Sequence, residues 1–488
     1  MMVPAPDEVV PAERLGRIHF VGIGGVGMAP LARIMLGRAL PVSGSDVKDT
    51  AVVRSLRELG ATVAIGQAPE NLADVDTVVV STDIPEGNIE VVEARRLGLR
   101  LLHRASALAA LMPGTRAVAG THGKTTTTSM VTVALRHCDA DPSFVIGGEL
   151  ASTGESGYAG TGDVLVVEAD ESDGTFLHYA PHVAVITNIE LDHPDHFADL
   201  AQVRDEFQRF ADRLAADGVL VACADDEAAR EVAAATAERG VRVLTYGAAE
   251  DADVRLGELG TVGGFPSFRL HVSAAAAVAG TGGAAAAAAA RSAEPTVLAP
   301  VTLSVPGRYN ALNAAAAFTV GLSLGFPADI LLEGLSSFGG ARRRMELKGE
   351  ANGIRVYDDY SHHPTEVIAA LSAARELAGA GRVVAAFQPH RYFRTRTFLH
   401  EFGPALAGAD AVVVLEVYSH GESPIPGVSG SVIAAETGLG PDDCVFEPDL
   451  ARVADRLTAF ARPGDLIVTI GAGDITEVGP RLLALLSE

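Results

Sequence analysis

The sequence predicts an α/β protein of three domains, and three observations support this prediction. Apolar runs of strand length alternate with helical stretches along almost the whole chain, which is typical of parallel sheets with crossover helices. The chain has 488 residues, enough for about three domains at roughly 150 residues each. Hydrophobic residues make up 48% of the chain, so each domain can bury a core of its own.

The first domain is expected to cover residues 1–114 and to begin as a nucleotide-binding βαβ unit. A strand at 17–23 runs into a glycine-rich loop, which is followed by a helix at 28–37. Proline and glycine interrupt the pattern at 112–115, which we interpret as a linker. Within this domain we also expect a short strand ending at Asp46 and strands at 77–81 and 100–102.

The glycine loop of the first domain has the spacing of a dinucleotide fingerprint. Gly22, Gly24 and Gly27 follow the pattern G-x-G-x-x-G, and Asp46 lies nineteen residues further on, where an acidic residue binds a ribose. Taken alone, this pattern fits a dehydrogenase that uses a nicotinamide dinucleotide. The loop could equally hold another diphosphate, such as that of a UDP-sugar.

The second domain, expected at 115–338, carries a phosphate-binding loop. Gly120-Thr121-His122-Gly123-Lys124-Thr125-Thr126 follows a strand at 116–119 and opens a helix that ends at 137. In such a loop, backbone N–H groups and the helix N-terminus surround phosphate oxygens. Lys124 would reach the β- and γ-phosphates, and the Thr125 hydroxyl would bind Mg²⁺. A plain glycine turn before a helix is the alternative.

Two further strands of this domain end in acidic segments. Glu168 ends a strand at 164–168, where a carboxylate can hold the same Mg²⁺ as Thr125. His193 follows a strand at 183–187 and could bind a second Mg²⁺, although this cation prefers oxygen. The rest of the domain is expected to hold a helix at 201–216, short β-like pieces after Gly247, and an Ala/Gly-rich surface insertion near 273–300.

The third domain, expected at 339–488, holds two cation-rich segments. Arg391 and Arg394 follow a strand and lie three residues apart, so together they could hold a carboxylate. His362 and His363 precede a helix that begins at Pro364, but no third ligand follows at zinc spacing. The other cation-rich segment is 342–344. Strands of this domain are expected at 354–358, 382–387, 411–415 and 465–470.

Charge and composition exclude several classes of protein. The net charge of −24, without a basic stripe, argues against partners such as nucleic acid and anionic membranes. The first fourteen residues carry three acidic side chains and no cation before Arg14, unlike a secretory leader, so we expect a cytoplasmic location. The three distant cysteines cannot form a disulfide framework, and the Ala/Gly-rich window is too weakly apolar to span a bilayer.

Together these segments resemble the Mur ligases of peptidoglycan synthesis, most closely the members that join L-alanine to UDP-N-acetylmuramate. The resemblance runs in family order from residue 18 to about residue 474. It implies a Rossmann-like UDP-binding domain, a central ATPase domain and a C-terminal Rossmann-like domain for the amino acid. The matching motifs are HFVGIGGVGMAPLA, GTHGKTTTT, EADESD, TNIELDH, PGRYNALNAAAA, DDYSHHPTE, FQPHRYFRT and GAGD.

The resemblance implies a role for each matching residue. Lys124, Glu168, His193 and Arg343 or Arg344 would be catalytic, with ATP and Mg²⁺ as the cofactors and Thr125, Glu168 and His193 as metal ligands. The UDP-sugar would meet Gly22, Gly24, Gly25, Gly27, Met28, Asp46 and Ser81. ATP would meet residues 120–126 together with Asn310 and Asn313, and L-alanine would meet Tyr360, His362, His390, Arg391 and Arg394.

The implied reaction forms an amide through an acyl phosphate, in the synthesis of the cell wall that supports cell shape and division. Three alternatives stay open: a murein peptide ligase or another ligase of this type, a nicotinamide-dependent oxidoreductase, and a non-catalytic sensor of UDP-muramic acid. The partners would be small molecules, and the oligomeric state would be compatible with an equilibrium between monomer and dimer.

The chain departs from the family pattern at a few positions. Several Mur ligases use a carbamylated lysine in the central domain, but no lysine lies between Lys124 and Lys348. Tyr309 and Pro194 stand where histidine and methionine are common, and the segment 81–83 differs from the expected Ser-Ala pair. These departures affect the expected substrate contacts more than the expected class of reaction.

Overall fold

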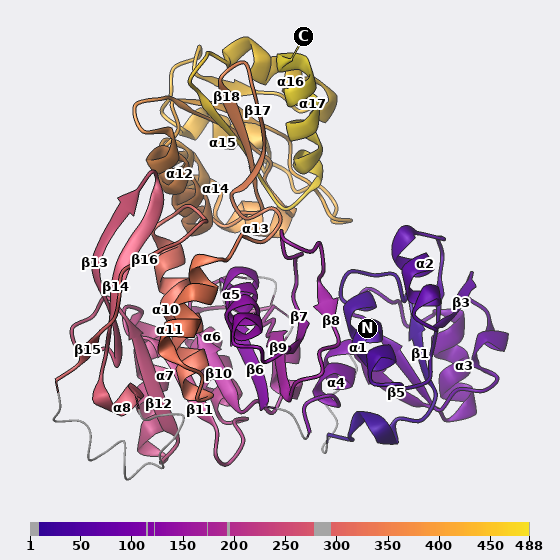
Figure 1. Cartoon of the computed structure of the whole chain (residues 1–488). Coiled ribbons are helices and arrows are strands. Elements are labelled where there is room, and N and C mark those ends of the chain that lie inside the picture. Colours follow the sequence, from indigo (N-terminus) through magenta and orange to yellow (C-terminus); the bar gives the residue numbers. More distant parts are fainter. Residues whose placement is uncertain are drawn as a thin grey trace.

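The computed structural model describes residues 9–113, 116–121, 123–172, 174–192, 196–277 and 294–487. Strands and helices alternate along the chain and form three separate sheets, so the predicted α/β fold is confirmed (Figure 1). Each sheet lies within one of the three expected domain ranges, whose boundaries themselves stay a prediction.

The first sheet is parallel throughout and has the strand order β3-β2-β1-β4-β5. The first strand ends at Val21, two residues earlier than expected, because Gly22 turns the chain with a φ of +75°. The elements are β1 (Ile18–Val21), α1 (Ala29–Gly37), β2 (Val42–Asp46), α2 (Ala51–Glu58), β3 (Thr62–Ile65), β4 (Thr77–Val80), α3 (Ile89–Leu97), β5 (Arg100–His103) and α4 (Arg104–Ala109).

The second sheet places β6 between β10 and β9, all parallel. Helices α5, α10 and α11 share one apolar cluster on one face of this sheet. The elements up to residue 247 are β6 (Arg116–Thr121), α5 (Lys124–His137), β7 (Ser143–Val145), β8 (Gly157–Tyr158), β9 (Val164–Glu168), β10 (Val183–Ile186), α6 (Leu200–Ala211), β11 (Val219–Cys223), α7 (Glu227–Glu238) and β12 (Arg242–Gly247).

The segment after Gly247 is β structure as expected, but two of its strands are longer than the short pieces predicted. The chain forms a long antiparallel hairpin, in which buried and half-buried residues alternate along β14 with the period of a strand. The predicted insertion falls mostly on residues 278–293, outside the described residues. The remaining elements are β13 (Val254–Val262), β14 (Phe265–Val272), α8 (Ala274–Ala277), β15 (Thr296–Val297), β16 (Val301–Thr302), α10 (Tyr309–Ser323) and α11 (Ala328–Ser336).

The third sheet has the order β17-β18-β22-β19-β20-β21, and only its edge pair β17–β18 is antiparallel. Helix α12 begins at Pro364 as expected, because His363 and Glu366 form a capping box. The elements are β17 (Glu346–Ala351), β18 (Ile354–Asp359), α12 (Pro364–Ala378), β19 (Val383–Phe387), α13 (Tyr392–Thr397), α14 (Leu399–Leu406), β20 (Ala411–Val414), α15 (Gly430–Glu436), β21 (Cys444–Phe446), α16 (Leu450–Phe460), β22 (Leu466–Ile470) and α17 (Val478–Leu486).

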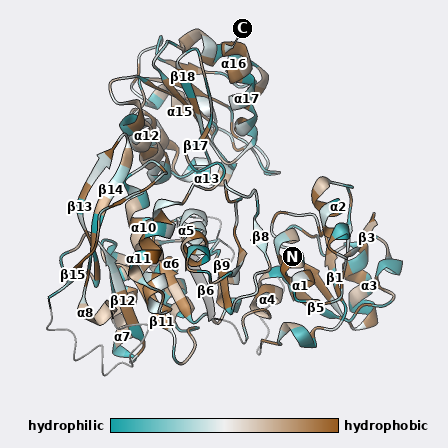
Figure 2. Ribbon diagram, viewed as in Figure 1, coloured by the Kyte–Doolittle hydropathy of each residue, from teal (hydrophilic) through white to brown (hydrophobic). Residues whose placement is uncertain are grey.

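Hydrophobic residues gather in the strands and inner helices of each unit, with hydrophilic residues toward the outside (Figure 2). The first unit and one face of the central sheet share a continuous apolar cluster, to which Met112, Phe176 and Tyr179 belong. Helix α1 also meets β8 so closely that a Cβ atom on Gly157 would lie 2.4 Å from Cβ of Pro30. The first two units therefore pack as one body. None of the described helices has the length and apolarity needed to cross a membrane.

Candidate active site

The phosphate loop connects β6 to α5, at the carboxyl edge of the central sheet. Gly123 ends the loop in the left-handed conformation, with a φ of +64°, and a Cβ atom there would lie 3.1 Å from Oδ1 of Asn313. Thr125 and Thr126 follow on the first turn of α5 and are buried. Gly120 and Thr121 lie on β6, and the side chain of Thr121, like the whole of His122, falls outside the described residues.

Lys124 faces carboxylates that follow β9. Its Nζ atom donates to Oε2 of Glu171 at 2.7 Å and to Oδ1 of Asp170 at 3.2 Å. Burial alone would lower the pKa of Lys124, but the charges of Glu171, Asp170 and Glu168 outweigh burial and raise it. Burial would likewise raise the pKa of Asp170, but the Lys124 ammonium lowers it. Lys124 is therefore a fixed positive charge at the loop.

Glu168 and Thr125 have the oxygen donors that Mg²⁺ prefers. The Thr125 hydroxyl lies 3.2 Å from both carboxylate oxygens of Glu168, and the backbone N–H of Gly147 donates to Oε2 at 2.7 Å. Burial raises the pKa of Glu168, and the Lys124 charge opposes that change. Among the described residues, no three His, Cys, Asp or Glu side chains converge as a metal site. The third expected ligand, His193, lies outside them.

The two asparagines expected near the adenine join helix α10 to the phosphate loop. Thr127 donates its hydroxyl hydrogen to Oδ1 of Asn313 at 3.2 Å, and Nδ2 of Asn313 donates to Oδ1 of Asn310 at 2.9 Å. Nδ2 of Asn310 in turn donates to the carbonyl of Pro306 at 2.7 Å. The chain of bonds fixes the start of α10 against the start of α5.

The glycine loop of the first unit lies at the carboxyl ends of β1 and β2. The backbone N–H of Gly24 donates to Oδ2 of Asp46 at 2.9 Å, so the expected ribose partner also braces the loop. Met28 directly follows the loop, is 3% exposed and packs in the apolar cluster of the first unit. Of the other expected contacts, Gly22, Gly25 and Gly27 lie in the loop, and Ser81 follows β4 directly.

The five residues expected to bind the amino acid come together at one end of the third sheet. The rings of Tyr360 and His362 have centroids 5.5 Å apart, and those of His362 and His390 are 5.9 Å apart. Arg391 and Arg394 stand at the start and in the middle of the helical turn that follows. Burial lowers the pKa of His362 to about 4 and that of His390 to about 3, so both imidazoles are neutral near pH 7.

The two candidate arginines near the γ-phosphate occupy different surroundings. Arg343 is bound within its own unit, donating from Nη2 to the carbonyl of Gly471 at 2.6 Å and from Nε to Asp358 at 3.3 Å. Burial would lower the pKa of Arg344, but Glu366, Asp359 and Glu168 raise it. The charge of Arg344 thus acts on Glu168, the candidate Mg²⁺ ligand of the central unit, as well as on two carboxylates of its own unit.

Three family models match successive parts of the chain. The Mur ligase family catalytic domain matches residues 17–116, the Mur ligase middle domain matches residues 118–321, and the Mur ligase glutamate ligase domain matches residues 343–473. A curated UDP-N-acetylmuramate–L-alanine ligase of Acidothermus cellulolyticus is 51% identical over 98% of this chain and 96% of its own length. The chain belongs to the Mur ligase family.

Other proteins similar to this Mur ligase include curated sequences and solved structures. A UDP-N-acetylmuramate–L-alanine ligase of Thermobifida fusca is 47% identical over 100% of both chains. The crystal structure of the UDP-N-acetylmuramate–alanine ligase MurC from Thermotoga maritima is 27% identical, with a TM-score of 0.75 over 96% of this chain and 98% of that one. A murein peptide ligase of Psychrobacter arcticus, 24% identical with a TM-score of 0.66, shares the fold.

Several residues of this Mur ligase were not assigned from the sequence. Asp170 and Glu171 hold Lys124, and Arg104 of α4 lies 4.0 Å from Asp170 and beside Gly27, between the glycine loop and the phosphate loop. Asp192 and Glu422 hold the two arginines of the amino-acid group. The sequence predicted carboxylates at the ends of the strands at 164–168 and 183–187. No local pattern identifies the side chains that these carboxylates bind.

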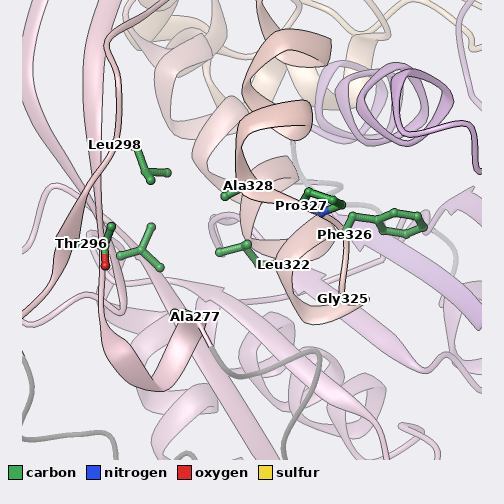
Figure 3. Close-up of a pocket in the computed structure, with 9 residues that line it drawn as sticks. Ala277, Thr296, Leu298, Leu322, Gly325, Phe326, Pro327 and Ala328 are labelled. Atoms are coloured by element: carbon green, nitrogen blue, oxygen red, sulfur yellow. The ribbon is translucent and has the colours of Figure 1, made fainter.

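A separate cavity of about 250 Å³ lies between the outer strands of the central sheet and the loop joining α10 to α11. Figure 3 shows its mainly apolar lining, in which Leu298 and Thr296 face Leu322 and Ala328. None of the predicted site residues lines it, so the candidate site of this Mur ligase lies elsewhere.

Proposed function

We propose that this Mur ligase joins L-alanine to the lactyl carboxylate of UDP-N-acetylmuramate, converting ATP to ADP and phosphate. One observation carries the proposal: across the boundary between the second and third units, the amino-acid group contacts the acidic segment after β10, the strand that pairs with β6 before the phosphate loop. Arg394 of the amino-acid group is ion-paired with Asp192 of the central unit at 3.0 Å, and the charge of Arg344 acts on Glu168. ATP and an amino acid held at these two places would be neighbours.

The reaction requires both the phosphate loop and the amino-acid group, because a free carboxylate is a poor acylating agent and must be activated before the amine attacks. Attack of the sugar carboxylate on the γ-phosphate gives an acyl phosphate and releases ADP. Lys124 and Arg344 would neutralise the charge that gathers on the transferring group. Mg²⁺, held by Thr125 and Glu168 and, as expected from the family, by His193, would supply further charge neutralisation.

The second half of the reaction uses the third unit. The alanine amine attacks the activated carbonyl, forms the amide bond and releases phosphate, losing a proton as it does so. Arg391 and Arg394 would hold the alanine carboxylate and thereby orient the amine. Because His362 and His390 are neutral near pH 7, they would not repel the ammonium group of the incoming amino acid.

The curated relatives support alanine as the amino acid. Proteins that are 46% to 51% identical over nearly the whole chain carry the name UDP-N-acetylmuramate–L-alanine ligase. We extend the proposal to the remaining expectations: domain boundaries near residues 114 and 338, a cytoplasmic location where ATP and UDP-sugars are present, and an equilibrium between monomer and dimer.

The proposal is tested by measuring ADP release with UDP-N-acetylmuramate and a panel of amino acids. We expect L-alanine to give the highest kcat/KM. A preference for glutamate or for a tripeptide would replace our proposal with another ligase of the family, and turnover of a nicotinamide dinucleotide would replace it with an oxidoreductase. Binding of the UDP-sugar with no phosphate release would indicate a sensor.

Oxygen-18 labelling tests the acyl phosphate separately. If the lactyl carboxylate is labelled, the phosphate released on amide formation should carry one labelled oxygen, because the acyl C–O bond breaks in the second step. Phosphate free of label would exclude the acyl phosphate, even if the amide is made.

A further inference from the structure

An ion pair crosses the boundary between the central and C-terminal units beside the amino-acid group. Asp192 ends the acidic segment after β10, and Arg394 lies on α13. Nε of Arg394 donates to Oδ1 of Asp192 at 3.0 Å, and Nη2 donates to Oδ2 at 3.3 Å. The side chains are only 5% and 13% exposed. Because the pair is buried and joined by two hydrogen bonds, the two side chains are held in one geometry.

The pair fixes the direction in which the Arg394 guanidinium points. The group is planar, so holding Nε and Nη2 on one carboxylate also sets the position of Nη1. Nη1 lies 3.5 Å from Nδ1 of His390, on the side of the amino-acid group. Asp192 therefore binds the edge of the guanidinium that carries Nε and Nη2, and this leaves Nη1 directed toward His390.

The second arginine of the group is held differently. Nε of Arg391 donates to Oε1 of Glu422 at 2.7 Å, and the backbone N–H of Phe393 donates to Oε2 of the same carboxylate. Glu422 belongs to the same unit as Arg391, whereas Asp192 belongs to the central unit. Among the contacts of the described residues, the pair with Asp192 ties the orientation of Arg394 to the contact between the two units.

We propose that Asp192 is a positioning residue, which holds Arg394 in the orientation that receives the carboxylate of the amino acid. The inference rests on the proposed function and adds that the central unit, through Asp192, sets the orientation of one arginine of the amino-acid group. Asp192 itself does not touch the reacting atoms. It acts through Arg394, and its removal weakens amino-acid binding more than it weakens phosphoryl transfer.

The test is Asp192→Asn, which keeps the shape of the side chain but removes its charge and one acceptor. We expect KM for L-alanine to rise at least about tenfold, while KM for ATP and for UDP-N-acetylmuramate changes less than about twofold. The matched control is Glu149→Gln, because Glu149 pairs with Arg342 across the same two units at 3.3 Å but both side chains are about half exposed. The control should retain the wild-type KM for L-alanine.

Two further measurements separate positioning from a general structural role. Exchange of oxygen-18 between the bridging and non-bridging positions of the β,γ-phosphates of ATP, measured with UDP-N-acetylmuramate and without alanine, should persist in Asp192→Asn. In an Arg394→Lys background, Asp192→Asn should raise KM for L-alanine by much less than it does in the wild type. Asp192→Glu, which keeps the charge, should give an intermediate KM and is the second variant if Asp192→Asn does not fold.

An alanine KM within about twofold of wild type in Asp192→Asn, or equal loss of the exchange reaction, would overturn the inference. Wild-type enzyme that forms no product with L-alanine would instead refute the proposed function. The two failures are therefore distinguishable.

Discussion

At the scale of single residues, Lys124 shows how its surroundings set the chemistry of the site. Glu171, 2% exposed, and Asp170 hold the Lys124 ammonium and keep it charged. We expect Lys124→Met to lower the rate of ATP turnover at least about 10³-fold, because the charge that meets the terminal phosphates is lost. Binding of UDP-N-acetylmuramate, measured by calorimetry, should change less than about threefold.

The control for this prediction is Lys348→Met, because Lys348 pairs with Glu346 in the third unit, away from the phosphate loop. It should keep wild-type turnover. If Lys124→Met still hydrolyses ATP at a rate near that of the wild type, the assignment of the phosphate loop is wrong.

His390 leads to a prediction about pH. Its pKa is lowered by burial to about 3, whereas an unfolded histidine titrates near 6.5. Between these values the unfolded chain binds a proton that the folded protein does not, so the free energy of unfolding must fall as pH falls from about 6.5 toward 3. We expect His390→Asn to make the free energy of unfolding, measured in urea at pH 7, 6 and 5, fall less steeply.

His400→Asn serves as the control, because His400 is 80% exposed beside Glu436 and should leave the slope unchanged. His362, whose pKa is lowered to about 4, contributes in the same direction and keeps part of the slope in the His390 variant. Curves for wild type and His390→Asn that run parallel would contradict the prediction.

A site residue could be predicted from the sequence when a local sequence pattern marks its function. Lys124, Thr125 and Glu168 could be assigned because a loop between strand and helix and a carboxylate at a strand end are local features. The Asp192–Arg394 pair joins residues 202 positions apart, so only the folded chain brings them together. The same reason explains why Arg104 was missed.

At the scale of elements, the carboxyl ends of β6 and β9 set the geometry of the site. Their register places Gly120 beside Glu168, so the phosphate loop and the candidate Mg²⁺ ligand start from adjacent strands. This arrangement could be predicted, since parallel strands end at one edge of a sheet. The length of the β13–β14 hairpin was not predicted, and glycines at 257, 260, 263 and 264 lie at its bulge and turn.

The segment after β7 makes a prediction at this scale. A Cβ atom on Gly147 would lie 2.9 Å from both carboxylate oxygens of Glu168, so Gly147→Ala must displace that carboxylate. We expect kcat to fall at least about tenfold and the Mg²⁺ concentration needed for half-maximal rate to rise. Titration of the rate with Mg²⁺ measures both effects.

Gly87→Ala is the matched control, because a Cβ atom there meets no neighbour within 4 Å and the backbone is not left-handed. The rate of Gly87→Ala should depend on the Mg²⁺ concentration as the wild-type rate does. An unchanged Mg²⁺ requirement in Gly147→Ala would mean that Glu168 does not bind the metal.

At the scale of the whole molecule, the three units are joined in two different ways. The first and second share an apolar cluster, whereas contacts between the second and third include ion pairs such as Asp192–Arg394 and Glu149–Arg342. Apolar burial favours a permanent contact, and polar contacts can separate and form again. Three domains could be predicted from the sequence. Their different junctions could not, because each depends on side chains far apart in the chain.

The close contact of α1 with β8 gives the prediction for the whole molecule. A Cβ atom on Gly157 would lie 2.4 Å from Cβ and 2.6 Å from Cα of Pro30, and the backbone of α1 cannot move aside without opening the shared core. We expect Gly157→Ala to destabilise the contact between the first two units by about 1–3 kcal/mol. In scanning calorimetry, the transition of the first two units should shift down or split, while that of the C-terminal unit stays in place. KM for UDP-N-acetylmuramate should rise, because the sugar would be held by one unit and its carboxylate activated on the other. Gly87→Ala, in the first unit and with open space around it, should leave both properties unchanged. If Gly157→Ala melts and binds like the wild type, the first two units are not held together at this contact.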